Sequence, residues 1–194
     1  MVGSKLEKEI ISIFNRDIST LLSINQISKK LKKSYPNINN KVNSLIKEGI
    51  LTKLETGRSY LCTINLENEK AIALLTINEA DKKKQYEKKI NLIKEEINDI
   101  KNKFKVYTIL LHNTTLIFVL DYLNDKEAIK NLYENIKKFD LIFFDKTSFQ
   151  QYLIKNPNLL NEFIIIYSYE KYYELVNEIK NNLILNNKKV KNKD

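Results

Sequence analysis

The stretch of residues 23–66 constrains the fold of this chain more than any other, because it places two helical patterns directly before a hairpin pattern. Ser23 followed by Gln26 is a capping box, a pairing that opens a helix. Pro36 fits the first turn of a second helix, where its missing N–H would be unpaired in any case. Gly49 can provide the left-handed residue that ends this helix. The sequence therefore predicts two helices joined by a short turn.

A preceding helix and a following hairpin complete the pattern. Ser4 followed by Glu7 is another capping box, and apolar residues then recur at helical spacing. Strand-like patterns at residues 51–55 and 58–66 meet at Thr56-Gly57, where glycine supplies the positive φ of a tight hairpin. Three helices followed by a hairpin are the layout of a winged helix-turn-helix. This layout favours DNA binding.

The helix that begins near Pro36 is the predicted recognition helix. Its apolar side chains form one face, and side chains that can bond base edges or phosphates are assigned to the opposite face. Lysines of the preceding helix and turn, with an arginine at the hairpin tip, would meet the DNA backbone or an adjacent minor groove. The predicted DNA-binding residues are Asn37, Asn40, Lys41, Ser44 and Lys47 on the recognition helix, Lys29, Lys30, Lys32 and Lys33 before it, and Arg58 on the wing.

The distribution of charge also favours a polyanionic partner. Residues 1–66 contain 11 lysines and arginines against 5 acidic residues, whereas residues 67–187 contain 18 of each. Positive charge is thus concentrated on the predicted helix-turn-helix, as a phosphate-binding surface requires. Double-stranded DNA is the predicted partner.

Composition restricts the other classes of protein. A chain of 194 residues with 43% hydrophobic residues can bury a core without disulfides or metals. Cys62 is the single cysteine and fits a reducing, intracellular compartment. The charged start is unlike a signal peptide, and the most apolar stretch, residues 106–123, is broken by polar residues, so no export signal or membrane segment is predicted. The expected location is cytoplasmic and associated with the chromosome.

A long charged helix is predicted over residues 79–103, after a shorter helix at 69–77. Its apolar residues form a heptad seam of two to three repeats. Two interpretations remain open: the seam pairs two chains as a homodimer, or it packs on the sheet that follows. The seam residues are Tyr86, Ile90, Ile93, Ile97, Ile100 and Phe104.

An α/β domain is predicted after this segment, from alternating strand-like and helical patterns. Strands are expected at 105–111, 116–123, 140–145 and 163–167, with helices at 125–138, 147–154, 158–162 and 169–183. The expected fold class is α+β, with a winged helix-turn-helix at 1–68, connecting helices at 69–104, an α/β domain at 105–185 and a disordered basic tail at 186–194.

Two short stretches resemble a known family. Gly57-Arg58-Ser59-Tyr60 followed by Ile64-Asn65-Leu66-Glu67-Asn68 is similar to the wing exit of archaeal winged-helix regulators. Residues 144–170, which end in Tyr167-Ser168-Tyr169-Glu170, resemble the end of the nucleotidyltransferase-like domain that follows the DNA-binding domain in those proteins. The resemblance implies a nucleotidyltransferase-like fold for residues 105–185.

The chain departs from the active members of that family. An active nucleotidyltransferase carries a glycine-serine loop and an Asp-x-Asp pair that holds metal against the phosphates. Here His112-Asn113-Thr114-Thr115 replaces the loop, Asp121 stands alone, and no glycine follows Gly57. The domain is therefore expected to be degenerate, with no catalytic residue, metal ligand or cofactor. His112 is expected to face solvent, and the tyrosines between residues 167 and 173 are expected to pack rather than stack on bases.

The preferred interpretation is a non-enzymatic DNA-binding protein that regulates transcription. Three alternatives remain open. The first is a chromatin-architectural protein with little sequence preference, and the second is a nucleotidyltransferase-type enzyme acting on RNA or protein. In the third, the C-terminal domain docks a protein partner.

Overall fold

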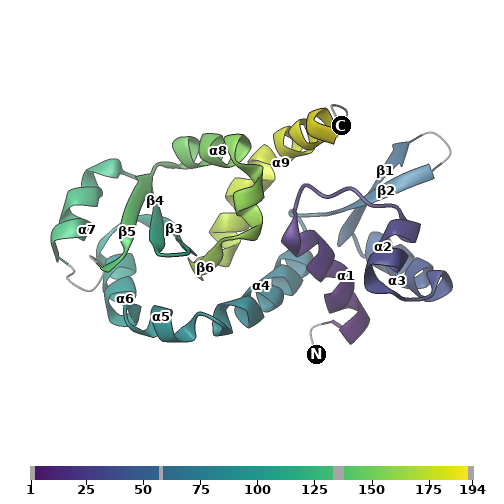
Figure 1. Ribbon diagram of the computed structural model, residues 1–194, viewed down its shortest axis with the longest axis horizontal. Helices are drawn as coiled ribbons and strands as arrows, with labels where there is room; N and C mark the ends of the chain where they lie inside the picture. Colours follow the sequence, from purple (N-terminus) through teal and green to yellow (C-terminus); the bar gives the residue numbers. More distant parts are fainter. Residues whose placement is uncertain (1–2, 57–58, 133–137, 192–194) are drawn as a thin grey trace. The chain divides into compact units, whose positions relative to one another are not determined.

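The computed structural model describes residues 3–56, 59–132 and 138–191, which form two compact units (Figure 1). The N-terminal unit contains residues 1–78 and 177–194, and the C-terminal unit contains residues 79–176. Helices α4 (Glu69–Lys84) and α9 (Tyr169–Lys191) each contribute residues to both units. The predicted boundaries at residues 68 and 185 therefore do not coincide with those of the units.

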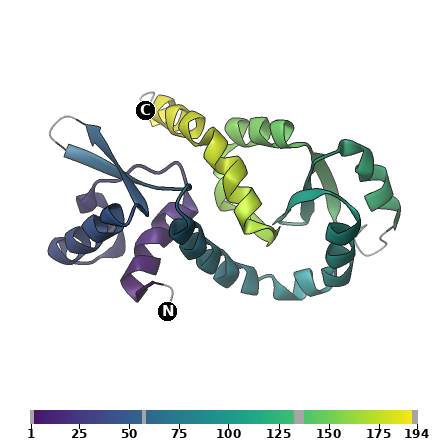
Figure 2. The same cartoon turned by 180° about the vertical axis from the view of Figure 1, so that it is seen from behind.

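The N-terminal unit has the predicted element order. Helices α1 (Lys5–Arg16), α2 (Ile24–Leu31) and α3 (Tyr35–Lys47) precede strands β1 (Leu51–Thr56) and β2 (Ser59–Ile64). Both predicted capping boxes form, and Gly49 has a φ of +71° at the end of α3. Strands β1 and β2 pair in antiparallel fashion and lie beside α3 (Figures 1 and 2). This is the layout of a winged helix-turn-helix.

The first turns of α4 belong to the core of the N-terminal unit, so the prediction that this unit ends at residue 68 is wrong. Leu74 and Leu75 of α4 are completely buried. Asn68 caps α4 by accepting a hydrogen bond from the Ala71 amide at 3.1 Å, and its side-chain amide donates to the Glu48 carbonyl at 3.1 Å. The sequence places no glycine or proline between the hairpin and this helix, so the chain continues directly into it.

The last turns of α9 also belong to the N-terminal unit. The ammonium group of Lys180 donates a hydrogen bond to the carbonyl of Ile64 at the end of β2. Ile179 and Leu183 are buried. The helix continues to Lys191, so the predicted disordered tail is wrong for residues 186–191. Lysine and asparagine do not stop a helix, and no glycine or proline interrupts it. Residues 192–194 lie outside the described part of the chain.

The C-terminal unit contains a four-stranded sheet in the order β5-β4-β3-β6. Strand β3 pairs in antiparallel fashion with both β4 and β6, and β4 pairs in parallel with β5. The strands and helices follow the predicted alternation, although residues 133–137 of the predicted helix 125–138 lie outside the described residues. The elements are β3 (Val106–His112), β4 (Thr115–Leu120), the 3₁₀ helix η1 (Leu123–Asp125), α7 (Lys126–Leu132), β5 (Asp140–Phe144), α8 (Lys146–Lys155), the 3₁₀ helix η3 (Pro157–Asn161) and β6 (Ile164–Tyr167).

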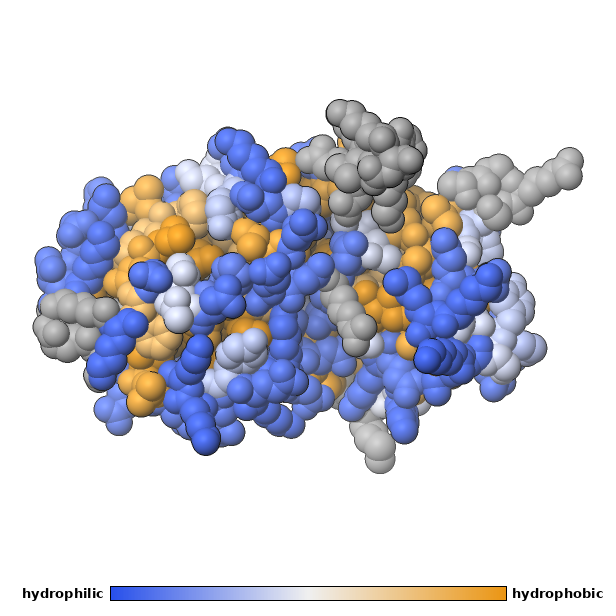
Figure 3. All heavy atoms as spheres, viewed as in Figure 1, coloured by the Kyte–Doolittle hydropathy of each residue, from blue (hydrophilic) through white to orange (hydrophobic). Residues whose placement is uncertain are grey.

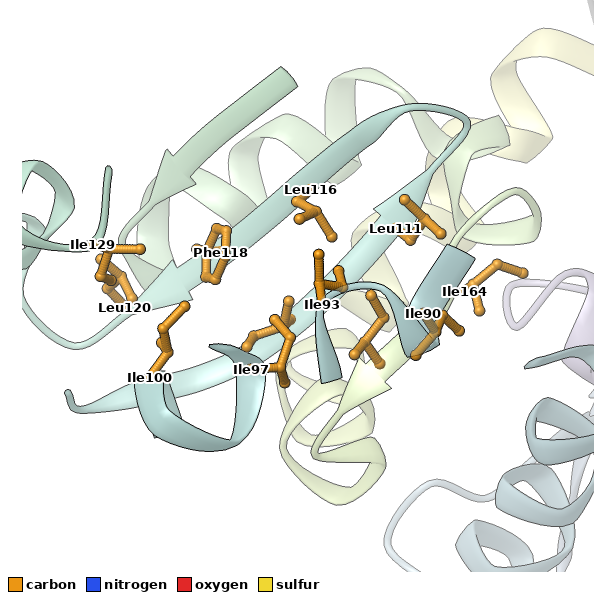
Figure 4. Close-up of a cluster of buried hydrophobic side chains, with 12 residues drawn as sticks. Ile90, Ile93, Ile97, Ile100, Leu111, Leu116, Phe118, Leu120, Ile129 and Ile164 are labelled. Atoms are coloured by element: carbon orange, nitrogen blue, oxygen red, sulfur yellow. The ribbon is translucent and has the colours of Figure 1, made fainter. Parts of the chain in front are cut away.

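The apolar seam packs on one face of this sheet. Ile93 and Ile100 are completely buried and lie in one cluster with Phe118 of β4 (Figure 4). Tyr86 and Phe104 are partly buried against the same cluster. Of the two interpretations of the seam, the structure supports packing within the chain. The seam is therefore not available as a dimer interface.

The long helix predicted at residues 79–103 is divided into three. Helix α4 ends at Lys84, α5 spans Glu87–Asn91 and α6 spans Lys94–Lys103. At both breaks the backbone forms tighter i to i−3 hydrogen bonds, from Tyr86 to Lys83 and from Ile93 to Ile90. No proline or glycine lies at either break, so local sequence signals do not mark them.

The opposite face of the sheet is covered by other helices. Strand β3 is buried from Tyr107 to Leu111, as expected of a strand covered on both faces. Phe149 of α8 and Tyr173 of α9 are almost entirely buried, and Tyr172 is 2% exposed. Tyr172 and Tyr173 therefore pack in the core, as the sequence predicted.

Candidate nucleic-acid interface

The two faces of α3 are clearly separated. Ile38, Val42 and Leu45 have no exposed surface, because they face the other helices of the N-terminal unit. Asn40 and Lys47 lie two turns apart on the opposite side and are exposed. The predicted recognition helix therefore presents polar side chains to solvent.

Asn43 lies on the same exposed face, although it was not among the predicted DNA-binding residues. It is exposed and lies three residues after Asn40 and four before Lys47, the spacing at which side chains share a helix face. Its side-chain oxygen accepts a hydrogen bond from the Tyr60 hydroxyl of β2 at 3.1 Å, and its amide donates to Asn39 at 3.2 Å. Asn43 thus connects the recognition helix to the wing.

The ring of Tyr60 also lies close to a lysine of the neighbouring strand. The ammonium group of Lys53 in β1 lies 4.8 Å from the ring centroid, within the range of a cation–π interaction. Lys53 forms an exposed ion pair with Glu55 at 3.2 Å. The wing therefore places an aromatic ring and a lysine beside the exposed face of α3.

Two of the lysines predicted to contact DNA form ion pairs within the N-terminal unit. Lys41 forms an ion pair with Glu7 at 3.1 Å, and Lys33 forms one with Glu9 at 3.1 Å. Both glutamates lie on α1. Lys41 follows Ile38 by three residues and precedes Leu45 by four, so it lies beside the buried face and not opposite it. The prediction that Lys41 projects from the exposed face is wrong.

The environment of Glu7 favours its charged form. Burial by itself would raise the pKa of this carboxyl. The amide of Ser4 donates to it, and Lys41 adds a hydrogen bond and a nearby positive charge. Together these interactions hold the pKa of Glu7 below its usual value, so the pair with Lys41 is ionised at neutral pH.

Ser44 is half-buried and bonded along its own helix. Its hydroxyl donates to the carboxylate of Glu48 at 3.0 Å. Glu48 also pairs with Lys70 of α4, and these two partners hold the pKa of Glu48 below its usual value. Ser44 therefore helps to fix the end of α3 against α4.

The remaining predicted residues lie at the surface. Lys29, Lys30 and Lys32 are exposed, and none has an ion pair among the described residues. Lys32 has a left-handed backbone, with φ of 52°, and ends α2. Asn37 is exposed beside a hollow of about 600 Å³ that Lys33, Asn40 and residues of α1 also line. Arg58 lies outside the described residues.

Hydrophilic residues dominate much of the visible surface, with apolar patches between them (Figure 3). The charged side chains of α2 and α3 belong to this hydrophilic surface. The exposed polar strip therefore consists of Asn40, Asn43 and Lys47 on α3, with Lys29, Lys30 and Lys32 before it. We refer to these six residues as the polar strip.

The residues considered for catalysis in the C-terminal unit have other partners. The Nε2 atom of His112 lies 2.7 Å from a carboxylate oxygen of Glu162, and the ring makes an edge contact with Phe163. His112 is therefore not the purely solvent-facing residue that the sequence predicted. Asp121 pairs with Lys146 at 3.2 Å.

The residues that the structure describes lack two features. They contain no group of three or more histidine, cysteine, aspartate or glutamate side chains that could hold a metal ion. Among the helices they form, none combines the length and apolar character needed to cross a membrane.

Comparisons with known proteins identify no family. No protein-family model matches the chain, and no curated protein matches it. Among solved structures, the chain is similar to MepR, a transcription regulator of the Staphylococcus aureus multidrug efflux pump MepA. The match has a TM-score of 0.36 and 12% identity, and it covers 51% of this chain and 78% of MepR. A similarity of this size supports no assignment of function.

Proposed function

We propose that this protein binds double-stranded DNA through the N-terminal unit and regulates transcription. The observation that carries the proposal is the polar strip, a solvent-facing set of asparagines and lysines on the second helix of a helix-turn-helix and just before it. Three of its lysines precede α3, where phosphate contacts position a recognition helix. Asparagine on such a helix can bond both the N6 and N7 atoms of adenine.

The exposed residues receive distinct roles in this proposal. Asn40 and Asn43 would enter the major groove and read base edges. Lys29, Lys30 and Lys32 would neutralise phosphates without reading sequence, and Lys47 would do so at the far end of α3. Arg58, on the wing, would reach phosphate or an adjacent minor groove.

Lys33 and Lys41 receive a different role from the one that the sequence suggested. Their ion pairs with Glu9 and Glu7 hold α1 against the helix-turn-helix. They would position α3 and contribute less to the contact with phosphate. Exposed ion pairs stabilise proteins by about 1 kcal/mol or less, so this is a modest effect for Lys33.

Fluorescence anisotropy with the full chain tests the proposal. The titrations would use labelled duplexes from a random pool and from genomic fragments. The wild-type protein should bind duplex DNA, and Asn40→Ala should cost about 1–3 kcal/mol on the preferred duplex with a smaller loss on random DNA. Asn25→Ala, an exposed asparagine on α2 outside the polar strip, is the matched control and should leave both affinities unchanged.

Two outcomes would count against this proposal. An equal loss from Asn40→Ala on every duplex would indicate an architectural protein with little sequence preference. Failure of the wild-type chain to bind any duplex would contradict DNA binding itself.

We further propose that the C-terminal unit is a degenerate nucleotidyltransferase-like domain without catalytic activity, and that the protein acts in the cytoplasm on the chromosome. The tight turn between β3 and β4 and the pairing of Asp121 with Lys146 support the first point. Incubation with magnesium and a radioactive nucleoside triphosphate should label neither the protein nor added RNA. Labelling that disappears in Asp121→Ala would overturn this part of the proposal.

A further inference from the structure

The C-terminal unit contains a cavity that the proposed function does not use. It has a volume of about 420 Å³ and lies among α4, α5, α6 and the end of β6. This volume falls within the range of about 300–1,000 Å³ that is typical of small-molecule sites. The cavity is therefore large enough to hold a small organic ligand.

The inner part of the cavity is apolar. Ile90 and Ile97 line it from α5 and α6, and Ile166 and Tyr167 line it from β6. Figure 4 shows Ile90 and Ile97 projecting from their helices toward the sheet. Ile90, Ile97 and Ile166 are each less than a tenth exposed, so the core holds this surface in place. An apolar or aromatic body would be desolvated there.

The rim of the cavity is strongly basic. Lys83, Lys84, Lys94 and Lys101 line it, against a single acidic lining residue, Glu87. Lys84 is paired with Asp81 at 2.8 Å, so the other three lysines supply the excess charge. This concentration of positive charge belongs to a unit whose overall charge is close to neutral. A local excess of one sign inside a concave surface attracts ligands of the opposite sign.

Two of these lysines contact residues of β6 at the cavity. The ammonium group of Lys83 donates to the Ile166 carbonyl at 2.8 Å, and burial lowers its pKa. The ammonium group of Lys101 lies 5.9 Å from the centroid of the Tyr167 ring. Lys83 is therefore fixed by a hydrogen bond, and the exposed Lys101 lies near the Tyr167 ring at the apolar part of the cavity.

Lys94 is more accessible. It is exposed, has no ion pair within the described part of the chain, and is the first residue of α6. A cation is disfavoured at a helix N-terminus, because the helix dipole is positive there. Helix stability thus does not explain Lys94, whereas an anion that contacts both Lys94 and Lys101 would be favoured by their two positive charges.

We propose that this cavity binds a small aromatic carboxylate. The aromatic body would lie against Ile97, Ile166 and Tyr167, and the carboxylate would accept charge-assisted hydrogen bonds from Lys94 and Lys101. The amides of Asn91 and Asn98, which also line the cavity, are positioned to bond the remaining polar atoms of the ligand. This site is separate from the polar strip, and its occupation does not depend on DNA binding.

Isothermal titration calorimetry of the full chain with 2-naphthoate tests the proposal. The neutral analogue 2-naphthamide, which has the same ring system, serves as the control ligand. The carboxylate should bind, and the amide should bind about tenfold more weakly or worse, because it cannot form the charge-assisted contacts. The double variant Lys94→Gln/Lys101→Gln should lower the affinity for the carboxylate to that of the amide.

Matched variants distinguish the loss of this site from a general loss of positive charge and from misfolding. Lys88→Gln/Lys89→Gln removes the same charge from exposed residues of α5 outside the cavity and should leave binding unchanged. Asn98→Trp should fill the cavity from its exposed rim and abolish binding while the circular dichroism spectrum stays that of the wild type. The proposal is wrong if 2-naphthoate does not bind at millimolar concentration, if the amide binds equally well, or if both double variants weaken binding alike.

Discussion

Lys180 is an unusual residue of the N-terminal unit, because a lysine side chain is rarely buried. It is 9% exposed, and its ammonium group donates to the carbonyl of Ile64. Burial lowers its pKa to about 8, and the negative charge of Glu67 only partly opposes this shift. The residue therefore attaches the last turns of α9 to the wing strand at an electrostatic cost.

The cost of burying Lys180 predicts a specific pH dependence. The unfolded chain keeps this proton up to a pKa near 10.5, whereas the folded chain releases it near 8. The unfavourable contribution is therefore fully present below pH 8 and is relieved as the pH rises toward 10.5. Relative to Lys180→Met, the free energy of unfolding of the wild-type protein should rise by roughly 1 kcal/mol per pH unit in this window.

Urea denaturation of both proteins across this pH range measures the effect. The comparison with Lys180→Met is needed because Cys62, whose pKa is raised by burial to about 11, contributes in the opposite direction. Lys155→Met, an exposed lysine on α8, is the control and should give a curve parallel to that of the wild type. Parallel curves for Lys180→Met as well would show that Lys180 is not buried as described.

Single residues also show which side-chain positions the sequence could predict and which predictions were wrong. The spacing of Lys41 from Ile38 and Leu45 already places it beside the buried face of α3, and the spacing of Asn43 from Asn40 and Lys47 places it on the exposed face. Residue type alone made Lys41 a candidate for DNA contact, whereas spacing separates the two residues. The ion pair between Lys41 and Glu7 joins residues 34 positions apart, and no local pattern indicates it.

At the scale of elements, the burial of the apolar seam of α5 and α6 predicts how two substitutions change stability. Ile93 is completely buried against the sheet, whereas its neighbour Leu92 is 60% exposed. Ile93→Ala should therefore destabilise the C-terminal unit by about 2–5 kcal/mol, and Leu92→Ala should change its stability by about 0.5 kcal/mol or less. Urea denaturation followed by circular dichroism would measure both.

Light scattering on the same two variants tests the alternative use of the seam. Because the seam is occupied within the chain, neither substitution should change the molar mass of the protein in solution. A loss of dimers in Ile93→Ala, with its stability unchanged, would instead assign the seam to an interface between two chains.

Element types could be predicted from the sequence, but the breaks and ends of the helices could not. Serine caps mark the starts of α1 and α2, and Gly49 marks the end of α3, because these signals are local. The breaks near Tyr86 and Ile93 have no proline or glycine, so no local signal marks them. The extension of α9 to Lys191 was also missed, since a polar segment gives no periodic signal.

At the scale of the whole molecule, the two units differ in net charge and in fold. The N-terminal unit, residues 1–78 and 177–194, contains 17 lysines and arginines against 9 acidic residues, whereas the C-terminal unit, residues 79–176, contains 16 against 15. The predicted winged helix-turn-helix was recovered, because its caps, turn glycines and apolar periodicity all indicate the same elements. Its boundaries were not recovered, since α4 and α9 complete the N-terminal core through contacts between distant residues.

The salt dependence of DNA affinity tests the central claim most directly. Each phosphate contact contributes about 0.9 to the slope of log affinity against log salt. The triple variant Lys29→Gln/Lys30→Gln/Lys47→Gln should therefore give a slope shallower by roughly 2–3 than the wild-type protein. The control Lys88→Gln/Lys89→Gln/Lys155→Gln removes the same charge from exposed lysines of the C-terminal unit and should keep the wild-type slope. A slope that is unchanged in the first variant, or equally reduced in both, would contradict DNA binding through the polar strip.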